Sequence, residues 1–155
     1  MTTLRLFIRA TLLCGTLDIF YAIANTVRKG GSALGVLHSV ASGPFGNGMR
    51  DMGWTGGGLG LGVHFGIMAV MVATFLFAWR RMSALRSINP WVVGTLYGAA
   101  LYGVMYCVVL AWRWPALFPQ SDPAQIAIAL FPHIALVGIP LALMARRANT
   151  GLNQP

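Results

Sequence analysis

The sequence predicts an all-α, polytopic membrane protein, a bundle of four transmembrane helices that forms a single domain over residues 1–155. Three observations support this fold class. Hydrophobic residues make up 57% of the chain and charged residues 9%, whereas an ordinary soluble domain carries about 25% charged residues. Long apolar runs alternate with short clusters of arginine. These runs lack the alternation of barrel strands, and lipid admits only helices or closed barrels because backbone groups must be satisfied internally.

Charged residues divide the chain into four windows, which justify the four helices in order. The first window lies between Arg9 and Arg28 and contains Asp18 as its only charge. The next three windows hold 28, 26 and 23 residues without Lys, Arg, Asp or Glu. Since a helix needs about 20 residues to cross the hydrocarbon core of a bilayer, we expect spans near residues 6–27, 59–79, 90–112 and 124–144.

The distribution of basic residues predicts the orientation of these helices. Four spans place both termini on one side, and that side collects seven basic residues: Arg5, Arg9, Arg80, Arg81, Arg86, Arg146 and Arg147. The other side holds four basic residues and two acids: Arg28, Lys29, Arg50, Arg113, Asp51 and Asp122. Because basic residues concentrate on the cytoplasmic side of multi-pass proteins, we expect both termini in the cytoplasm.

Residues 28–58 form a predicted glycine-rich loop on the outer side. The stretch from residue 30 to residue 66 contains 13 of the 19 glycines. Within it, Ser32 to Ser42 carries apolar residues at helical spacing but is too short to span a bilayer. We expect a short helix at the outer surface there, or a re-entrant segment. Residues 43–58 are consistent with a flexible linker or with a loop packed over the outer mouth of the bundle.

Glycines at intervals of four predict close contacts between helices. They are Gly58, Gly62 and Gly66 in the second span, and Gly94 and Gly98 in the third. Small residues at positions i and i+4 let helix backbones approach closely in lipid. Packing within the bundle is the first interpretation, and contact with a second copy of the chain is the alternative.

Polar and ionisable residues inside the predicted spans are the candidate functional residues: Asp18, Asn25, His64, Tyr102, Tyr106 and His133. Ionisable groups within a membrane are costly and mark functional sites by default. Asp18 shares a helix face with Gly15, Ala22 and Asn25, so this face is expected to meet protein. Asp18, Tyr102 and His133 lie near the predicted midplane of the bilayer, and the other three lie further out.

We expect the Asp18 carboxylate to lie within hydrogen-bond reach of a polar group on another helix, with His133, Tyr102 and His64 as candidates. A carboxylate and an imidazole at one depth can hold each other's charge or share a proton. The cluster therefore indicates a small transport protein that handles a proton or a polar solute. The alternative is a hydrogen-bonded network that fixes helix packing, in a non-catalytic membrane accessory or packing subunit.

Other chemistries are not indicated. The chain has no CxxC, HExxH, P-loop or GxSxG motif, and without Glu it offers no pair of catalytic carboxylates. The depths of His64 and His133 differ by about 7 Å at 1.5 Å per residue, which disfavours a haem held by both. We expect no enzyme activity, no metal and no cofactor. The expected partner is the lipid bilayer, with a second copy or another membrane protein, rather than nucleic acid, because the basic residues are interspersed with apolar runs.

Several short motifs occur together along the chain: Gly15-Thr-Leu-Asp18, His38-Ser-Val-Ala-Ser-Gly43, Gly62-Val-His64-Phe65, Gly94-Thr-Leu-Tyr97-Gly98 and His133-Ile-Ala-Leu-Val-Gly138-Ile-Pro140. As a set, they resemble a group of small uncharacterised bacterial four-helix inner-membrane proteins, and more loosely the YagU-like proteins. The resemblance covers nearly the whole chain, and it implies a bacterial inner membrane and a four-helix layout. It implies no activity. Pro44 and the Arg50-Asp51 pair depart from the pattern of this group.

Overall fold

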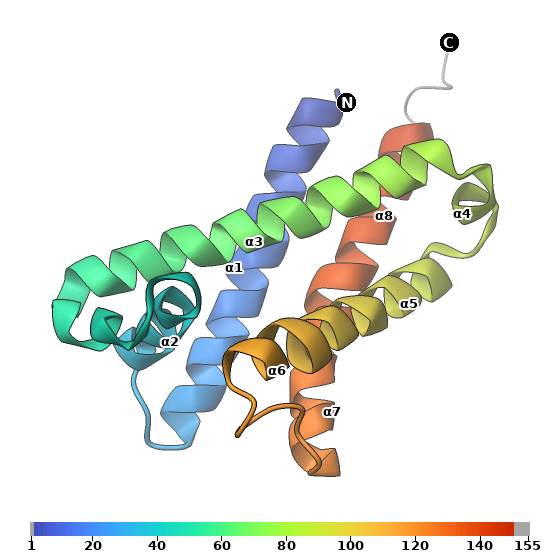
Figure 1. Ribbon diagram of the computed structural model, residues 1–155. Coiled ribbons are helices and arrows are strands. Elements are labelled where there is room, and N and C mark those ends of the chain that lie inside the picture. Colours follow the sequence, from blue (N-terminus) through green and yellow to red (C-terminus); the bar gives the residue numbers. More distant parts are fainter. Residues whose placement is uncertain (1, 151–155) are drawn as a thin grey trace.

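The computed structural model describes residues 2–150, which are predominantly helical and contain no strand (Figure 1). Four helical stretches are long and apolar enough to cross a membrane: Thr3–Arg28, Asn47–Arg81, Pro90–Arg113 and Pro123–Ala148. The all-helical fold class is therefore confirmed, and each predicted span falls inside one of these stretches.

The first stretch is a single helix, α1 (Thr3–Arg28). It begins where the Thr2 hydroxyl accepts a hydrogen bond from the backbone N–H of Arg5, which satisfies one of the unpaired donors of the first turn. It ends before Gly30, whose φ of +86° lies in the region that favours glycine. The buried side of α1 includes Leu6, Ala10 and Cys14, which join the hydrophobic core.

The glycine-rich segment is more regular than the sequence predicts. α2 (Ala33–Phe45) corresponds to the expected short helix and is capped by the Ser32 hydroxyl. A 3₁₀ helix, η1 (Asn47–Met52), connects α2 to α3 (Gly53–Arg81). The second long helix thus begins at Gly53 rather than near residue 59, and residues 43–58 are mostly helical instead of forming a linker or an irregular loop.

Glycines allow α2 to fold back against the first turns of α3. A Cβ atom added to Gly60 would lie 1.9 Å from the carbonyl oxygen of Leu37, so only glycine fits at this crossing. In contrast, an added Cβ at Gly58, Gly62 or Gly66 would meet no atom within 4 Å. The expected packing role of these three glycines within the bundle is therefore corrected: the packed register of α3 contains Gly56 and Gly60.

The third and fourth stretches each contain a central π-helical segment. A short helix, α4 (Ser83–Ser87), leads to α5 (Pro90–Tyr102), the π-helix η2 (Gly103–Val109) and α6 (Leu110–Arg113). The last stretch comprises α7 (Pro123–Phe131), the π-helix η3 (Pro132–Gly138) and α8 (Ile139–Thr150). Pro132 has no backbone N–H, so the α-helical hydrogen-bond pattern is interrupted where it stands.

The helices form two crossing pairs. Figure 1 shows α1 running beside the stretch from α7 to α8; α3 crosses both, and α5 crosses the stretch from α7 to α8. Gly94 and Gly98 lie at a close crossing, as predicted: a Cβ on Gly98 would lie 2.4 Å from the carbonyl oxygen of His133. The core between the pairs is apolar, and its largest fully buried side chains include Phe75, Leu141 and Val72.

The hydrophobic core lies toward the end of the bundle where α1 begins and α3 ends, which we call the α4 end. The buried residues of α1 all precede residue 20, and neither η2 nor α6 has a buried residue. The opposite end, the α2 end, is covered by α2 and by the segment between α6 and α7. The polar residues predicted as a site lie where the dense core gives way to this looser half.

Candidate functional site

Asp18 lies on the side of α1 that faces the bundle. Thr11, Cys14 and Gly15, which precede it by one or two turns on the same face, are buried. Asp18 itself is half-buried, because the packing of α1 loosens just beyond it. The expectation that Asp18 faces protein is therefore met.

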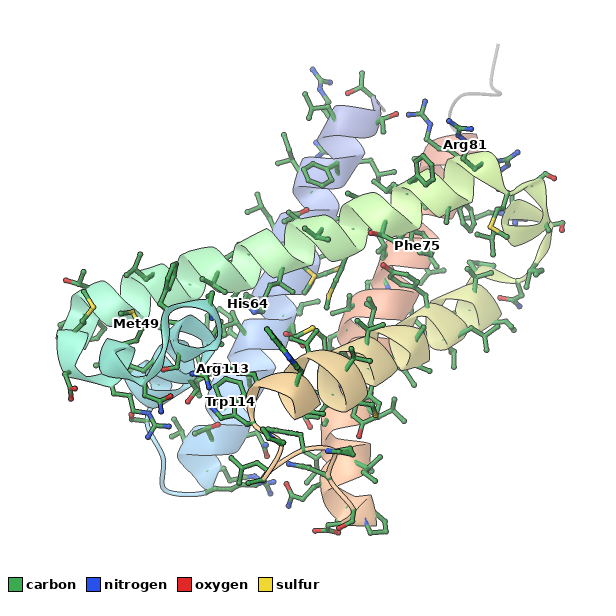
Figure 2. All side chains as sticks on the ribbon, in the orientation of Figure 1. Met49, His64, Phe75, Arg81, Arg113 and Trp114 are labelled. Atoms are coloured by element: carbon green, nitrogen blue, oxygen red, sulfur yellow. The ribbon has the colours of Figure 1, made fainter. Side chains whose placement is uncertain are left out.

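His64 reaches α1 from α3 directly beside this position. Figure 2 shows its side chain where α3 crosses α1, and its Nε2 lies 2.9 Å from the carbonyl oxygen of Gly15. A carbonyl oxygen can only accept, so the proton of a neutral His64 ring is on Nε2. The other ring nitrogen, Nδ1, then carries a lone pair that is free to accept a proton. His64 is buried, so this geometry is fixed by packing.

His133 approaches from the fourth stretch with the opposite nitrogen engaged. Its Nδ1 lies 2.8 Å from the carbonyl oxygen of Ala129, which places the proton of the neutral ring on Nδ1 and leaves Nε2 as the acceptor. The ring is half-buried. Two imidazoles from two different helices are thus held in single tautomers, each with one nitrogen available for a proton.

The Asp18 carboxylate lies within electrostatic range of both histidines and of Tyr106. The expected hydrogen bond is not formed, however: among residues 2–150, no hydrogen bond or ion pair holds this carboxylate. A charged carboxylate at the centre of a bilayer is costly, by about 2.5–3.5 kcal/mol on insertion scales. Asp18 is therefore an unpaired acid with two potential proton acceptors around it.

Tyr102 and Tyr106 form the aromatic wall of the same cluster. Their rings stack with centroids 4.8 Å apart, and both meet the His133 ring edge-on, at 6.1 Å for Tyr102 and 5.7 Å for Tyr106. Neither hydroxyl makes a hydrogen bond within the described part of the chain. The other two tyrosines differ, because Tyr21 donates to the Ile128 carbonyl oxygen at 3.0 Å and Tyr97 donates to that of Met71 at 2.6 Å.

Asn25 lies outside this cluster, which corrects the prediction that it belongs to it. Its side-chain oxygen accepts a hydrogen bond of 3.4 Å from Arg28 near the end of α1. Two further aromatic residues contribute that were not predicted. Tyr21 lies within electrostatic range of Tyr106, and the Phe118 ring packs edge-on against Tyr106 at 5.6 Å.

Phe118 also connects the cluster to the surface. It lines a cavity of about 340 Å³ formed by the segment between α6 and α7, together with Leu117, Gln120 and Gln125. Phe118 thus contacts both this open cavity and Tyr106. Its position in an irregular loop left no periodic pattern from which sequence reasoning could have placed it.

The cluster defined by Asp18, His64, Tyr102, Tyr106 and His133 is suited to proton chemistry. It contains one acid and two bases with unoccupied proton-accepting atoms, and two hydroxyl groups able to relay a proton. Within residues 2–150, no group of three His, Cys, Asp or Glu side chains is arranged to hold a metal ion. The chain matches no protein family, no curated protein and no solved structure with which it was compared.

Proposed function

We propose that this chain is a multi-pass membrane protein that moves a proton, or a small polar solute bearing one, through the cluster around Asp18. The observation that carries the proposal is that Asp18 has no hydrogen-bond partner among the described residues and lies within electrostatic range of His64 and His133. An acid whose only purpose was to join helices would be hydrogen-bonded, because an unsatisfied polar group in a low-dielectric interior destabilises the fold. Here the structural hydrogen bonds are made by other groups, such as the Tyr21 and Tyr97 hydroxyls.

The route follows from the order of the residues. Phe118 lines the cavity and contacts Tyr106, and Tyr106 adjoins His133. Asp18 and His64 come next, at the edge of the dense core. A proton that enters from the α2 end would pass the tyrosine hydroxyls, occupy His133 or Asp18, and leave through His64 toward the α4 end. A rearrangement of the core is required for the last step, since this half of the bundle is packed.

We also propose that the chain lies in the inner membrane of a bacterium with both termini in the cytoplasm. The four apolar stretches support a membrane location, and the motif resemblance favours the inner membrane of a bacterium. The excess of arginine at the α4 end supports cytoplasmic termini, with α2 lying at the outer surface. In a Cys107→Ser background, the Ser121→Cys variant should react with an impermeant thiol reagent in intact cells, and the Ser83→Cys variant should not. The reverse pattern would invert the orientation.

Proton flux into vesicles tests the function directly. The purified chain is reconstituted into liposomes that contain a pH-sensitive dye, and a pH gradient is imposed with potassium and valinomycin balancing charge. We expect flux above that of empty vesicles, and we expect its loss in Asp18→Asn. The matched control is Asp51→Asn, which makes the same chemical change at an exposed residue of η1. Flux equal to that of empty vesicles, or normal flux in Asp18→Asn, contradicts the proposal.

A non-catalytic packing subunit is the second candidate, and one observation favours it. Gly58, Gly62 and Gly66 line an exposed face of α3 with open space before them. Such a face fits a helix of a second copy or of another membrane protein. Under this alternative, Gly62→Leu disrupts a complex that is detected by crosslinking in membranes, whereas Asp18→Asn leaves the complex and its function unchanged.

A further inference from the structure

Four of the arginines at the α4 end of the bundle belong to α3, α4 and α8. This basic patch consists of Arg80 and Arg81 at the end of α3, Arg86 in α4 and Arg146 in α8. Backbone carbonyls hold them together. Arg86 Nη1 donates to the carbonyl oxygens of Trp79 and Arg80, at 2.8 and 3.0 Å, and Arg146 donates to the carbonyl oxygen of Arg86. Figure 2 shows Arg81 at this end, where α3 terminates.

The patch has no side-chain carboxylate to balance it. The three acidic residues of the chain are Asp18 within α1, Asp51 in η1 and Asp122 before α7, all of which lie away from this end. The guanidinium groups of Arg80 and Arg81 donate no hydrogen bond to the described residues. The Arg81 guanidinium lies over the face of the Phe77 ring, at 5.2 Å from the centroid. The four positive charges of the patch therefore have no carboxylate partner.

The basic residues at the α2 end differ, because most of them donate hydrogen bonds to other residues of the chain. Arg113 donates to the carbonyl oxygens of Ser42 and Gly43, both at 3.1 Å, and lies over the Trp114 ring. Lys29 donates to Gln125 at 3.1 Å, and Arg28 donates to Asn25. Most basic side chains at the α2 end therefore donate hydrogen bonds to protein acceptors. The exposed Arg80 and Arg81 side chains donate none to the described residues. The described residues therefore leave Arg80 and Arg81 available to an acceptor from outside the chain.

We infer that the basic patch binds the phosphate of an anionic phospholipid, an inference that rests on the membrane location proposed above. Arg80, Arg81 and Arg146 stand at the ends of two stretches that are able to cross a membrane, which is the level of lipid headgroups. Guanidinium groups match phosphate oxygens with two parallel hydrogen bonds. Basic residues beside membrane helices attract anionic lipids, at about 1 kcal/mol for each residue. The occupant is a lipid headgroup rather than free phosphate, because acyl chains add apolar contact along α3.

A lipid titration tests this binding. The full chain in neutral detergent is titrated with short-chain phosphatidylglycerol, or with phosphatidylcholine of the same chain length, and its thermal unfolding midpoint is recorded. We expect the anionic lipid alone to raise the midpoint. In the triple variant Arg80→Gln, Arg81→Gln, Arg146→Gln, the half-maximal concentration should rise by roughly 100-fold, given about fivefold for each charge removed. Glycerol phosphate, which has no acyl chains, should leave the midpoint unchanged.

The matched control is the triple variant Arg28→Gln, Lys29→Gln, Arg50→Gln, which removes equal charge at the α2 end and should retain the lipid response. Equal losses in both triple variants would show attraction by net charge alone and overturn the site. A response to glycerol phosphate as strong as that to the lipid would reassign the site to free phosphate.

If the triple variant with glutamine does not fold, a triple variant with lysine at the same three positions replaces it. Paired hydrogen bonding predicts weaker lipid binding in that variant, and unchanged binding contradicts it. Proton flux in neutral lipid is independent of all these outcomes.

Discussion

The Nε2 of His64 lies 2.9 Å from the carbonyl oxygen of Gly15, one turn before Asp18. This contact joins α3 to α1 and sets the tautomer of the imidazole that faces the proposed site. It depends on the glycine, because a Cβ at residue 15 would lie 2.6 Å from the ring of Phe65. The structural and chemical roles of His64 therefore reside on different nitrogens, Nε2 for the hydrogen bond and Nδ1 for the proton.

Substitution of His64 can separate these two roles. In His64→Gln, the amide nitrogen replaces the Nε2 donor, while the proton-accepting nitrogen is lost. We expect thermal stability close to that of the parent chain and a proton flux reduced at least severalfold. His64→Leu removes both roles, and we expect it to lose flux and also about 1 kcal/mol of stability. Normal flux in His64→Gln would exclude His64 from the proton route.

Replacement of Asp18 by asparagine should stabilise the fold. The carboxylate has no hydrogen-bond partner among the described residues, so Asn loses no contact and removes the cost of a charge near the bilayer centre. We expect an unfolding midpoint in detergent equal to or above that of the parent chain, together with loss of proton flux. A stability gain paired with a functional loss is typical of functional sites. A lower midpoint in Asp18→Asn would instead assign Asp18 a structural role.

The glycines of α3 provide a second matched comparison. Gly60→Ala places a methyl group against the backbone of Leu37, which cannot move without displacing α2. We expect destabilisation of about 1–3 kcal/mol, the usual range for overpacking. Gly62→Ala, two residues later, meets open space, so it should be neutral or stabilising by up to about 1 kcal/mol, because alanine favours the helix. Unfolding of both variants in detergent decides this, and equal effects would refute the α2–α3 contact.

The same glycines show how far the sequence predicts the fold. Charge windows and helix length determine the four long helices, because lipid permits few alternatives. The register of packing is less predictable, since Gly56–Gly60 and Gly58–Gly62–Gly66 have equal spacing on one helix. Only the position of α2 distinguishes them, and that position depends on contacts distant in sequence. The start of α3 at Gly53 also depends on its contact with α2. It could not be predicted from the sequence, because the glycines at residues 53–58 ordinarily interrupt helices.

Most residues of the candidate site could be predicted from the sequence, but their hydrogen bonds could not. Polarity and depth bring together Asp18, His133 and Tyr102, and the structure places these near one another with Tyr106 and His64. The hydrogen bonds, however, go to backbone carbonyls of Gly15 and Ala129, which carry no side-chain signal. Asn25 is polar and lies on the same helix face as Asp18. It is near the end of α1, however, where its side chain accepts a hydrogen bond from Arg28.

Access to the cluster should depend on Phe118. Phe118 lines the cavity at residues 115–122 and packs against the ring of Tyr106, so we expect Phe118→Ala to open space beside Tyr106. We expect proton flux to rise severalfold in this variant, with a small loss of stability because the ring is only half-buried. Leu117→Ala is the matched control, since Leu117 lines the same cavity and is exposed, and it should leave flux unchanged. The double variant Phe118→Ala, Asp18→Asn should show no flux, because a wider entrance still leads to Asp18. Residual flux in the double variant would mean that protons cross by a path that does not involve the cluster.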